Sequence, residues 1–370
     1  MNSFTSIQSR LLGFVLLLLT FNTSFCQSNN KTDDTYAFVN VNVLPMTSEA
    51  VLNSQTVLIK QGKIKKVGPA DKVKVPKDAT VIDGQGKYLM PGIAEMHAHI
   101  PVPGEGDDAL VKETLFLYLS NGITTIRGML GNPYHLELKK MVADGALLSP
   151  RIYTSSPSMN GNSVPTKEEA IQKVTQYKND GYDFLKIHPG IKKDVFDELV
   201  ATAQRVGIPF SGHVPADVGI HHALESHYAS IDHLDGYIDG LVPEEDNIDR
   251  TQGGFFGYNF TEQTEENLIP ELAKKTRAHN VWIVPTQSLF TRWFSPQDGA
   301  EIAVEPEMKY MSSRTLFAWR QSKQNIITNE AYSEARYDLF LDRRKALLRG
   351  LHEAGVDLLL CSDAPHLFNV

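Results

Sequence analysis

Apolar runs that end in or beside a metal-ligating side chain constrain this fold more than any other feature of the sequence. Their terminal residues are the pair His97 and His99, then Lys186, His213, His233 and Asp363. In a parallel α/β barrel the carboxyl ends of the strands converge on one mouth, so residues far apart in sequence can meet there. The pattern therefore predicts a metal site at the mouth of such a barrel.

Predicted strands alternate with helical stretches from Pro91 onward, which is typical of parallel βαβ units. We predict helices at 110–120, 167–180 and 194–206, among others. The predicted strands are 93–99, 122–127, 150–154, 182–188, 208–213, 229–234, 281–285 and 356–361. Eight strands are the number that closes a barrel, so the fold class predicted for residues 91–370 is α/β, a (β/α)8 TIM barrel.

Two regions between His233 and Asp363 are longer than βα units require. We interpret residues 236–280 and 287–345 as insertions over the barrel mouth, and 306–326 as an amphipathic helix within the second. The chain ends seven residues after Asp363. We therefore expect the eighth helix and the C-terminal sandwich strands to be missing from this sequence.

The N-terminal part of the chain predicts export followed by a small β unit. Residues 1–26 resemble a secretory signal peptide, with Arg10 before an apolar stretch that is too short to span a bilayer. Residues 27–35 are polar and predict a flexible linker, and residues 36–90 predict a small β-sandwich module. We expect a periplasmic or extracellular protein. Lipid attachment at Cys26 stays open.

Charge and cysteine content exclude several classes of protein. The net charge of -8 argues against a nucleic-acid partner, which would require a basic face. Once Cys26 leaves with the signal, Cys361 alone cannot form an intramolecular disulfide. We expect no stable membrane span after signal cleavage, a small-molecule or dipeptide substrate, and an oligomeric state that could include a homo-oligomer.

The chemistry of the proposed ligands depends on strand alternation. His97 and His99 are two residues apart on a predicted strand, so their imidazoles point the same way and can share one cation. Lys186 faces the lumen, where an ammonium group is costly unless it is paired or neutralised. A salt bridge is one solution, and reaction with carbon dioxide to give a carbamate that bridges two cations is the other.

The later strand ends complete this candidate site. His213 and His233 could supply nitrogen to a second metal, and Asp363 could bind one metal and accept a proton from the attacking water. Three further residues lie where they could touch a substrate. They are Arg127, which could bind a carboxylate or form a structural ion pair, and His188 and His366, which lie close to proposed ligands.

Taken in order, these residues resemble the amidohydrolase superfamily, in particular its imidazolonepropionase-related and prolidase-like branch. The resemblance implies a barrel with a small β-sandwich. It also implies one metal held by His97, His99 and Asp363, a second held by His213 and His233, and carboxylated Lys186 between them. Glu95 is a departure, because these proteins commonly carry Asp two places before the first ligand histidine.

From this resemblance we expect an amidohydrolase that acts on carbon–nitrogen bonds, dipeptidase-like in type. Two Zn²⁺ ions would activate a bridging hydroxide, and Asp363 would shuttle the proton. One alternative is a mononuclear deaminase-type enzyme in which Lys186 only forms a salt bridge. A second alternative is a non-catalytic periplasmic binding module built on the same barrel.

Overall fold

The computed structural model describes residues 35–104, 107–243 and 247–370. The predicted signal peptide and nearly all of the predicted linker lie outside these residues, while Thr35 already belongs to the first strand. The contacts of the chain divide it into two units, one ending at Pro91 and one beginning at Gly92. The sequence analysis places this boundary between residues 90 and 91. The two units are therefore described separately.

The first unit is a single five-stranded sheet. Its strands are β1 (Thr35–Val43), β2 (Leu52–Lys60), β3 (Lys63–Pro69), β4 (Thr80–Asp83) and β5 (Tyr88–Leu89). They follow the order β3-β2-β1-β4, and β5 also pairs with β1. Gln61 and Gly62 both have positive φ, as a two-residue hairpin between β2 and β3 requires.

This sheet has one covered face. Val41, Val43 and Val57 form its small core, whereas Ile64 and Tyr88 are more than half exposed. The described residues thus provide one layer of the predicted β-sandwich.

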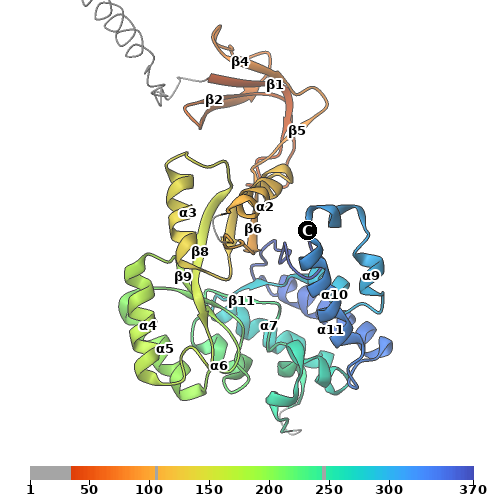
Figure 1. Ribbon diagram of the computed structural model, residues 1–370. Coiled ribbons are helices and arrows are strands. Elements are labelled where there is room, and N and C mark those ends of the chain that lie inside the picture. Colours follow the sequence, from red (N-terminus) through yellow and green to blue (C-terminus); the bar gives the residue numbers. More distant parts are fainter. Residues whose placement is uncertain (1–34, 105–106, 244–246) are drawn as a thin grey trace, which may run out of the picture. The chain divides into compact units, whose positions relative to one another are not determined.

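The second unit is a mixed α/β structure with a nearly closed parallel barrel (Figure 1). Seven strands run in the order β12-β11-β10-β9-β8-β7-β6, and every neighbouring pair is parallel. The strands are β6 (Ile93–Ala98), β7 (Ile123–Gly128), β8 (Arg151–Met159), β9 (Phe184–Ile187), β10 (Phe210–Gly212), β11 (Ser230–Asp232) and β12 (Trp282–Val284). The predicted α/β barrel class is confirmed.

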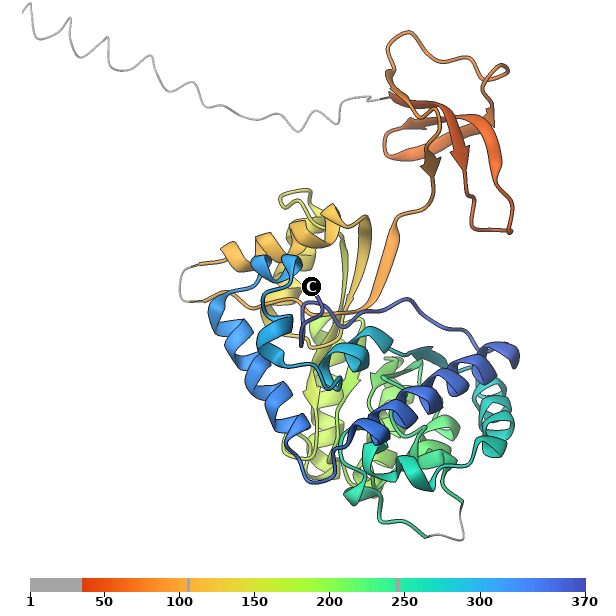
Figure 2. The same cartoon turned by 90° about the vertical axis from the view of Figure 1, so that its right-hand side faces the viewer.

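The eighth predicted strand, 356–361, is a correction. This segment lies between β12 and β6, where it receives a hydrogen bond from Ile283 N to Asp357 O and one from Met96 N to Leu360 O. Its only bridge within the described residues joins Ile283 to Leu358. Leu360 is 65% exposed, so the segment lacks the outer covering that buries a regular barrel strand. The C-terminal segment and β6 lie side by side in Figure 2.

Helices follow the barrel strands as the sequence predicts. They are α2 (Ala109–Ser120), α3 (Pro133–Ala143), α4 (Lys167–Asp180), α5 (Lys193–Val206), α6 (Gly219–Glu225), α7 (Ile269–Ala278) and α11 (Glu334–Glu353). Thr166 caps α4 at its start, and Gly181, in the left-handed conformation, ends it. None of the described helices combines the length and the apolar composition needed to cross a bilayer.

The two regions read as insertions contain regular barrel helices as well as irregular structure. α7 lies within 236–280, preceded by the 3₁₀ turns η1 (Asp239–Leu241), η3 (Arg250–Gln252), η4 (Phe255–Gln263) and η5 (Glu266–Leu268). The second region holds α8 (Gln287–Trp293), α9 (Gly299–Ile302), η6 (Pro306–Tyr310) and α10 (Ser313–Ile327). The single helix predicted at 306–326 is interrupted, because Ser312 caps a new helix through the backbone amide of Thr315.

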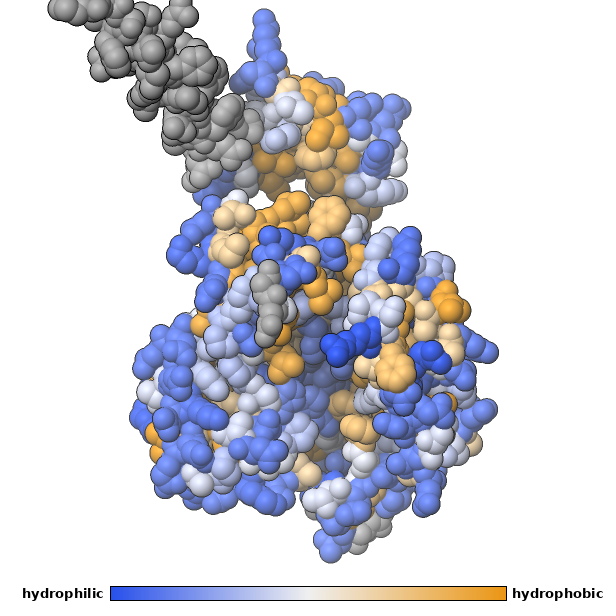
Figure 3. Space-filling model, viewed as in Figure 1, coloured by the Kyte–Doolittle hydropathy of each residue, from blue (hydrophilic) through white to orange (hydrophobic). Residues whose placement is uncertain are grey.

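The main hydrophobic core is built from buried residues between Met159 and Phe368 in the sequence, and a smaller one joins β6, β7, α2, α3 and Ile152 of β8. In the view of Figure 3 the lower part of the second unit is mainly hydrophilic, and apolar side chains gather toward its upper end. The barrel strands are thus packed against buried apolar side chains, and their carboxyl ends carry the residues described next.

Candidate active site at the barrel mouth

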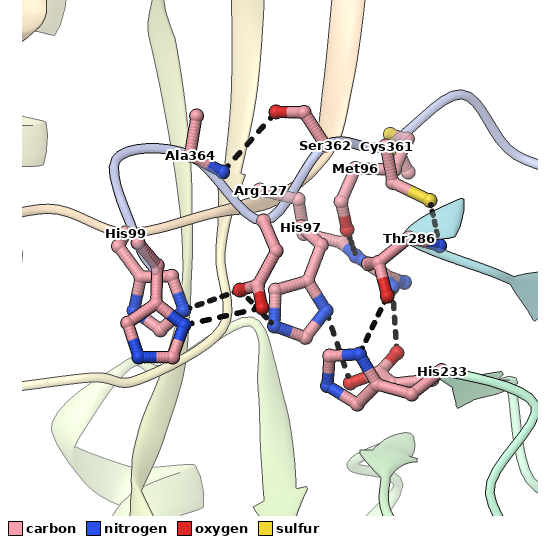
Figure 4. A network of polar contacts seen from close by, with 12 residues as sticks. Met96, His97, His99, Arg127, His233, Thr286, Cys361, Ser362 and Ala364 are labelled. Atoms are coloured by element: carbon pink, nitrogen blue, oxygen red, sulfur yellow. Dashed lines mark hydrogen bonds and ion pairs between the residues drawn. The ribbon is translucent and has the colours of Figure 1, made fainter. Parts of the chain in front are cut away.

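The first two predicted ligands converge on Asp363. His97 lies on β6 and His99 directly after it, and their Nε2 atoms lie 3.3 and 2.6 Å from Asp363 Oδ1. Figure 4 shows His97 between His99 on one side and His233 on the other. His97 is almost fully buried, whereas 25% of the His99 side chain is exposed. The predicted grouping of these three residues is therefore present.

Glu95 joins β6 to the segment that carries Asp363. Its carboxylate accepts hydrogen bonds from His97 N at 2.8 Å, from Ser362 N at 3.0 and 3.1 Å and from Ser362 Oγ at 2.6 Å. Glu95 is buried, and burial raises the pKa of its carboxyl. Glu95, the residue that departs from the expected Asp, thus links the backbone at His97 to the segment that carries Asp363.

Tyr118 of α2 contacts both His99 and the C-terminal segment. Its hydroxyl donates to the carbonyl of Ala364 and lies 3.2 Å from both the backbone N and the O of His99. The side chains of Glu95 and Tyr118 therefore add to the backbone hydrogen bonds that hold the C-terminal segment beside β6, although that segment forms no regular strand.

Lys186 on β9 points into the barrel and pairs with Asp232 on β11. The distance from Nζ to Asp232 Oδ2 is 2.6 Å, and both side chains are almost fully buried. Burial raises the pKa of Asp232, but the charges of Lys186 and Arg127 outweigh it and hold that pKa below its usual range. The salt bridge that the sequence left open for Lys186 is thus formed, with a partner that the sequence analysis did not assign.

Arg127 lies beneath this pair. It donates to Met96 O at 2.9 Å and Ser230 Oγ at 3.0 Å, and its guanidinium lies 3.6 Å from Asp232 Oδ1. It does not line the cavity that contains the histidines. Its position suits charge balance around Asp232 better than the predicted contact with a substrate carboxylate.

His213 and His233 follow β10 and β11, and each has one ring nitrogen engaged by the protein. His213 Nδ1 lies 3.0 Å from Asp235 Oδ2, and His233 Nδ1 lies 2.7 Å from Thr286 Oγ1. The two ring centroids are 4.9 Å apart. A hydrogen bond at Nδ1 fixes the ring and leaves Nε2 as the nitrogen that could bind a metal.

The donor set fits a divalent cation. Two groups have ligand atoms within 4.8 Å of one another, His97 with His99 and Asp363, and His97 with Asp232 and His233. His97 Nδ1 is buried and makes no hydrogen bond among the described residues, although it lies 3.4 Å from Asp232 Oδ2, so this nitrogen is available to a cation. The second group contains Asp232 and His97 beside His233 and does not include His213, which the sequence predicted as a ligand of a second metal.

Protonation states in the cluster also suit metal binding. Burial lowers the pKa of His97 and His233 well below the usual range, so both imidazoles are neutral. Burial raises the pKa of Asp363, but its contacts with His99 and His366 outweigh this effect and hold that pKa well below its usual range. Neutral imidazoles and ionised carboxylates are the forms that bind metals.

A cavity of about 300 Å³ opens over these residues. Both histidines predicted to touch substrate line it. His188 stacks on His213 with ring centroids 4.9 Å apart, and burial lowers its pKa to about 2. His366 lies 4.8 Å from the His99 ring, with 41% of its side chain exposed.

Phe256 covers two of the imidazoles. Its ring centroid lies 5.9 Å from that of His213 and 5.2 Å from that of His233. Its φ of 57° is left-handed, a conformation that costs a non-glycine residue of order 1–3 kcal/mol and that is found disproportionately at functional sites. A loop residue of this kind has no readable pattern in sequence, which is why the sequence analysis missed it.

Asp232 could have been found in sequence. It precedes His233 in a short apolar run and stands two residues after Ser230, so alternation places it inside the barrel with Lys186. A lysine that points into the barrel, such as Lys186, requires a buried anion as partner. Asp232 is the acidic residue of β11 that points into the barrel.

Comparisons with known proteins agree with this geometry. The model of the amidohydrolase family matches residues 88–369. An adenine deaminase of Ruegeria sp. (strain TM1040) is 34% identical over 112 residues, which make up 29% of this chain and 18% of that protein. The chain thus matches less than a fifth of the length of that curated relative.

Solved structures show the same fold. The bottromycin amidohydrolase superposes with a TM-score of 0.61 at 22% identity, covering 90% of this chain and 70% of its own. A Xaa-Pro dipeptidase with bound methionine in its active site gives 0.59 at 16% identity, covering 90% and 80%. Identities this low speak for the fold alone.

Proposed function

This chain belongs to the amidohydrolase family, and from that premise we propose that it is a metal-dependent hydrolase of carbon–nitrogen bonds in small, dipeptide-like substrates. The observation that supports this most is the pair of donor groups that share His97. One group contains Asp363, which also borders the cavity where a substrate would lie.

The chain's own residues supply binding and proton transfer. A divalent cation in this site would make water nucleophilic near neutral pH and polarise the substrate carbonyl. Asp363, ionised and open to the cavity, is positioned to accept the proton of the attacking water and deliver it to the leaving nitrogen. Phe256 and the barrel walls limit the access of bulk water, which strengthens electrostatic interactions inside.

We propose that Lys186 becomes carboxylated and bridges two Zn²⁺ ions, with His213 completing the second site. In the ammonium form Lys186 pairs with Asp232, so carbamate formation must replace that contact. Metal analysis of the purified protein tests this. About two ions per chain are expected for wild type and one for Lys186→Ala. Retention of both ions without the lysine would contradict a bridging role.

A hydrolysis assay with the metal-loaded protein tests the reaction itself. A panel of dipeptides and lactams should yield turnover that Asp363→Asn lowers by a factor of 100 or more, since general acid–base catalysis contributes roughly 10²–10⁴-fold. Tight ligand binding without any turnover would instead support the non-catalytic binding module.

A mononuclear deaminase is the second candidate. It is favoured by the compact group of His97, His99 and Asp363, by the engagement of Lys186 with Asp232, and by the match to an adenine deaminase. One metal per chain together with ammonia release from an aminopurine would favour the mononuclear deaminase over the amide hydrolase.

We also propose that the protein is exported, on the basis of the signal-like residues 1–26. Expression in a bacterial host followed by cell fractionation tests it. The mature chain should be found outside the cytoplasm, with a mass that lacks this segment.

A further inference from the structure

A second and larger cavity adjoins the one over the histidines. Its volume is about 490 Å³, and it shares Pro189, Gly254, Phe255 and Trp293 with the first. Because four residues border both spaces, the two cavities lie next to each other. We call this second cavity the aromatic chamber.

Aromatic rings dominate the walls of the chamber. Trp293 packs against Phe255 with centroids 5.3 Å apart, and Tyr258 and Tyr332 lie parallel within 9° at 6.1 Å. The remaining members are Asn259, Phe294, Ser322, Asn325, Ile326, Asn329 and Ala331. The chamber thus presents ring faces, aliphatic groups and the amides of three asparagines, and no charged side chain.

The polar ends of the aromatic side chains are already engaged by the protein. Tyr258 donates to Ser333 O at 3.1 Å, Tyr332 to Phe294 O at 3.0 Å, and Trp293 Nε1 to Ser322 Oγ at 3.1 Å. A ligand in the chamber therefore meets mainly the ring faces, which favour another aromatic ring in offset or edge-to-face contact.

The two cavities differ sharply in charge. The site cavity includes Lys186, Asp235, Asp239 and Arg250 along with Asp363, whereas no residue that lines the chamber carries a charge. A substrate that fits both spaces would place its polar amide over the metal ligands and a neutral, apolar group in the chamber.

Two consecutive residues form the partition between the spaces. Phe256 packs on His213 and His233, while Phe255 packs on Trp293 on the chamber side. Phe255 is 57% exposed and lines both cavities, so its ring stands at their junction. A substrate group passing from the site into the chamber would contact this ring first.

We propose that the chamber is the subsite for an aromatic side chain next to the scissile amide, so that the enzyme prefers dipeptides with an aromatic residue. This inference rests on the proposed amide hydrolysis and specifies its substrate. An aromatic side chain buries about 150–250 Å² when enclosed, so we expect a 10- to 100-fold preference in kcat/KM over alanine.

The test uses the metal-loaded full chain and two matched substrate pairs, glycyl-phenylalanine with glycyl-alanine, and phenylalanyl-glycine with alanyl-glycine. At least one pair should show the aromatic preference. Asn325→Trp fills the chamber from α10 and should lower the aromatic-to-alanine ratio of kcat/KM at least tenfold. Gln324→Trp, its exposed neighbour outside the chamber, is the matched control and should leave the ratio unchanged.

A ratio near one in both wild-type pairs, or an Asn325→Trp variant that keeps the wild-type preference, would overturn the proposal. Calorimetry with N-acetyl-phenylalaninamide and N-acetyl-alaninamide separates this outcome from failure of the proposed function. One outcome is that the protein binds the aromatic amide at least tenfold more tightly than the alanine amide without hydrolysing any dipeptide. If wild type and Gln324→Trp show this difference and Asn325→Trp does not, the chamber is supported and only the proposed reaction is wrong. Equal binding of both amides refutes the chamber.

Discussion

Arg344 lies on α11 and hydrogen-bonds the backbone of His233, a proposed metal ligand. Its side chain is completely buried, and it donates to His233 O at 2.6 Å, Pro285 O at 2.8 Å and Gln287 Oε1 at 2.9 Å. Its guanidinium also lies 3.5 Å from the centre of the Phe290 ring. Burial lowers the pKa of Arg344 to about 9, so it remains a cation at neutral pH.

Replacing Arg344 with methionine keeps an apolar stem but removes every donor. Three acceptors then lose their partner, and each buried acceptor left unsatisfied costs about 1–3 kcal/mol. Loss of a desolvated cation from the face of Phe290 adds up to about 2 kcal/mol. Relief of the desolvated charge offsets part of this, so we expect a loss of ~3–5 kcal/mol, in line with other broken buried ionic networks.

Scanning calorimetry measures this loss. Domains of 150–250 residues lose roughly 2–4 °C in Tm per kcal/mol, so the Tm of Arg344→Met should fall by about 6 °C or more. The control is Arg349→Met on the same helix, where an exposed side chain should change stability by no more than about 0.5 kcal/mol. Metal content should fall with Arg344→Met, since His233 loses its backbone anchor.

Equal Tm values for Arg344→Met and Arg349→Met would refute this reasoning. The result would mean that the carbonyls of His233 and Pro285 find other donors, and that α11 does not fix the end of β11. Arg344→Lys refines the test, because it keeps the charge but cannot reproduce the planar fork of donors.

Three further outcomes follow from the same structure. Burial raises the pKa of Asp239 to about 7. The stability that its neutral form contributes should therefore be lost as pH rises from about 4 through 7. The Asp239→Asn variant should flatten this part of the Tm–pH curve. Lys323→Met removes a buried ammonium that donates to Ser295 O and Oγ at 2.7 and 2.9 Å, and urea unfolding should show a loss of ~3 kcal/mol. Gly257→Ala places a Cβ 2.2 Å from Asp239 Oδ1 at a φ of 75°, so the loop carrying Phe256 should shift and be cleaved faster in limited proteolysis.

Strand positions could be predicted from sequence because short apolar runs report burial directly. The ends of β6, β9, β10 and β11 carry the residues that the sequence placed there, and the barrel brings them together. Convergence follows from topology alone, since all parallel strands end at the same mouth.

The remaining features depend on contacts that local patterns do not encode. The run 356–361 is the most apolar of the predicted strands, yet within the described residues it forms one bridge, although it hydrogen-bonds to both β12 and β6. Leu360 is exposed, so the apolar composition of this run did not report its burial. Arg127 has the spacing of a mouth residue but turns toward Asp232 beneath the site. Phe256 owes its place over the histidines to a left-handed backbone that no periodicity predicts.

Charge balance links the ion pair seen here to the carbamate inferred from sequence. With Lys186 as ammonium, its charge and that of Arg127 offset the anion of Asp232. Conversion to a carbamate would turn one cation into an anion next to Asp232 and near Asp363, and buried like charges are strongly unfavourable without compensation. Divalent cations would supply that compensation, so under the proposed function we expect carboxylation of Lys186 to be coupled to metal loading. On this proposal the salt bridge and the carbamate would be two ionic forms of one site, selected by its metal content.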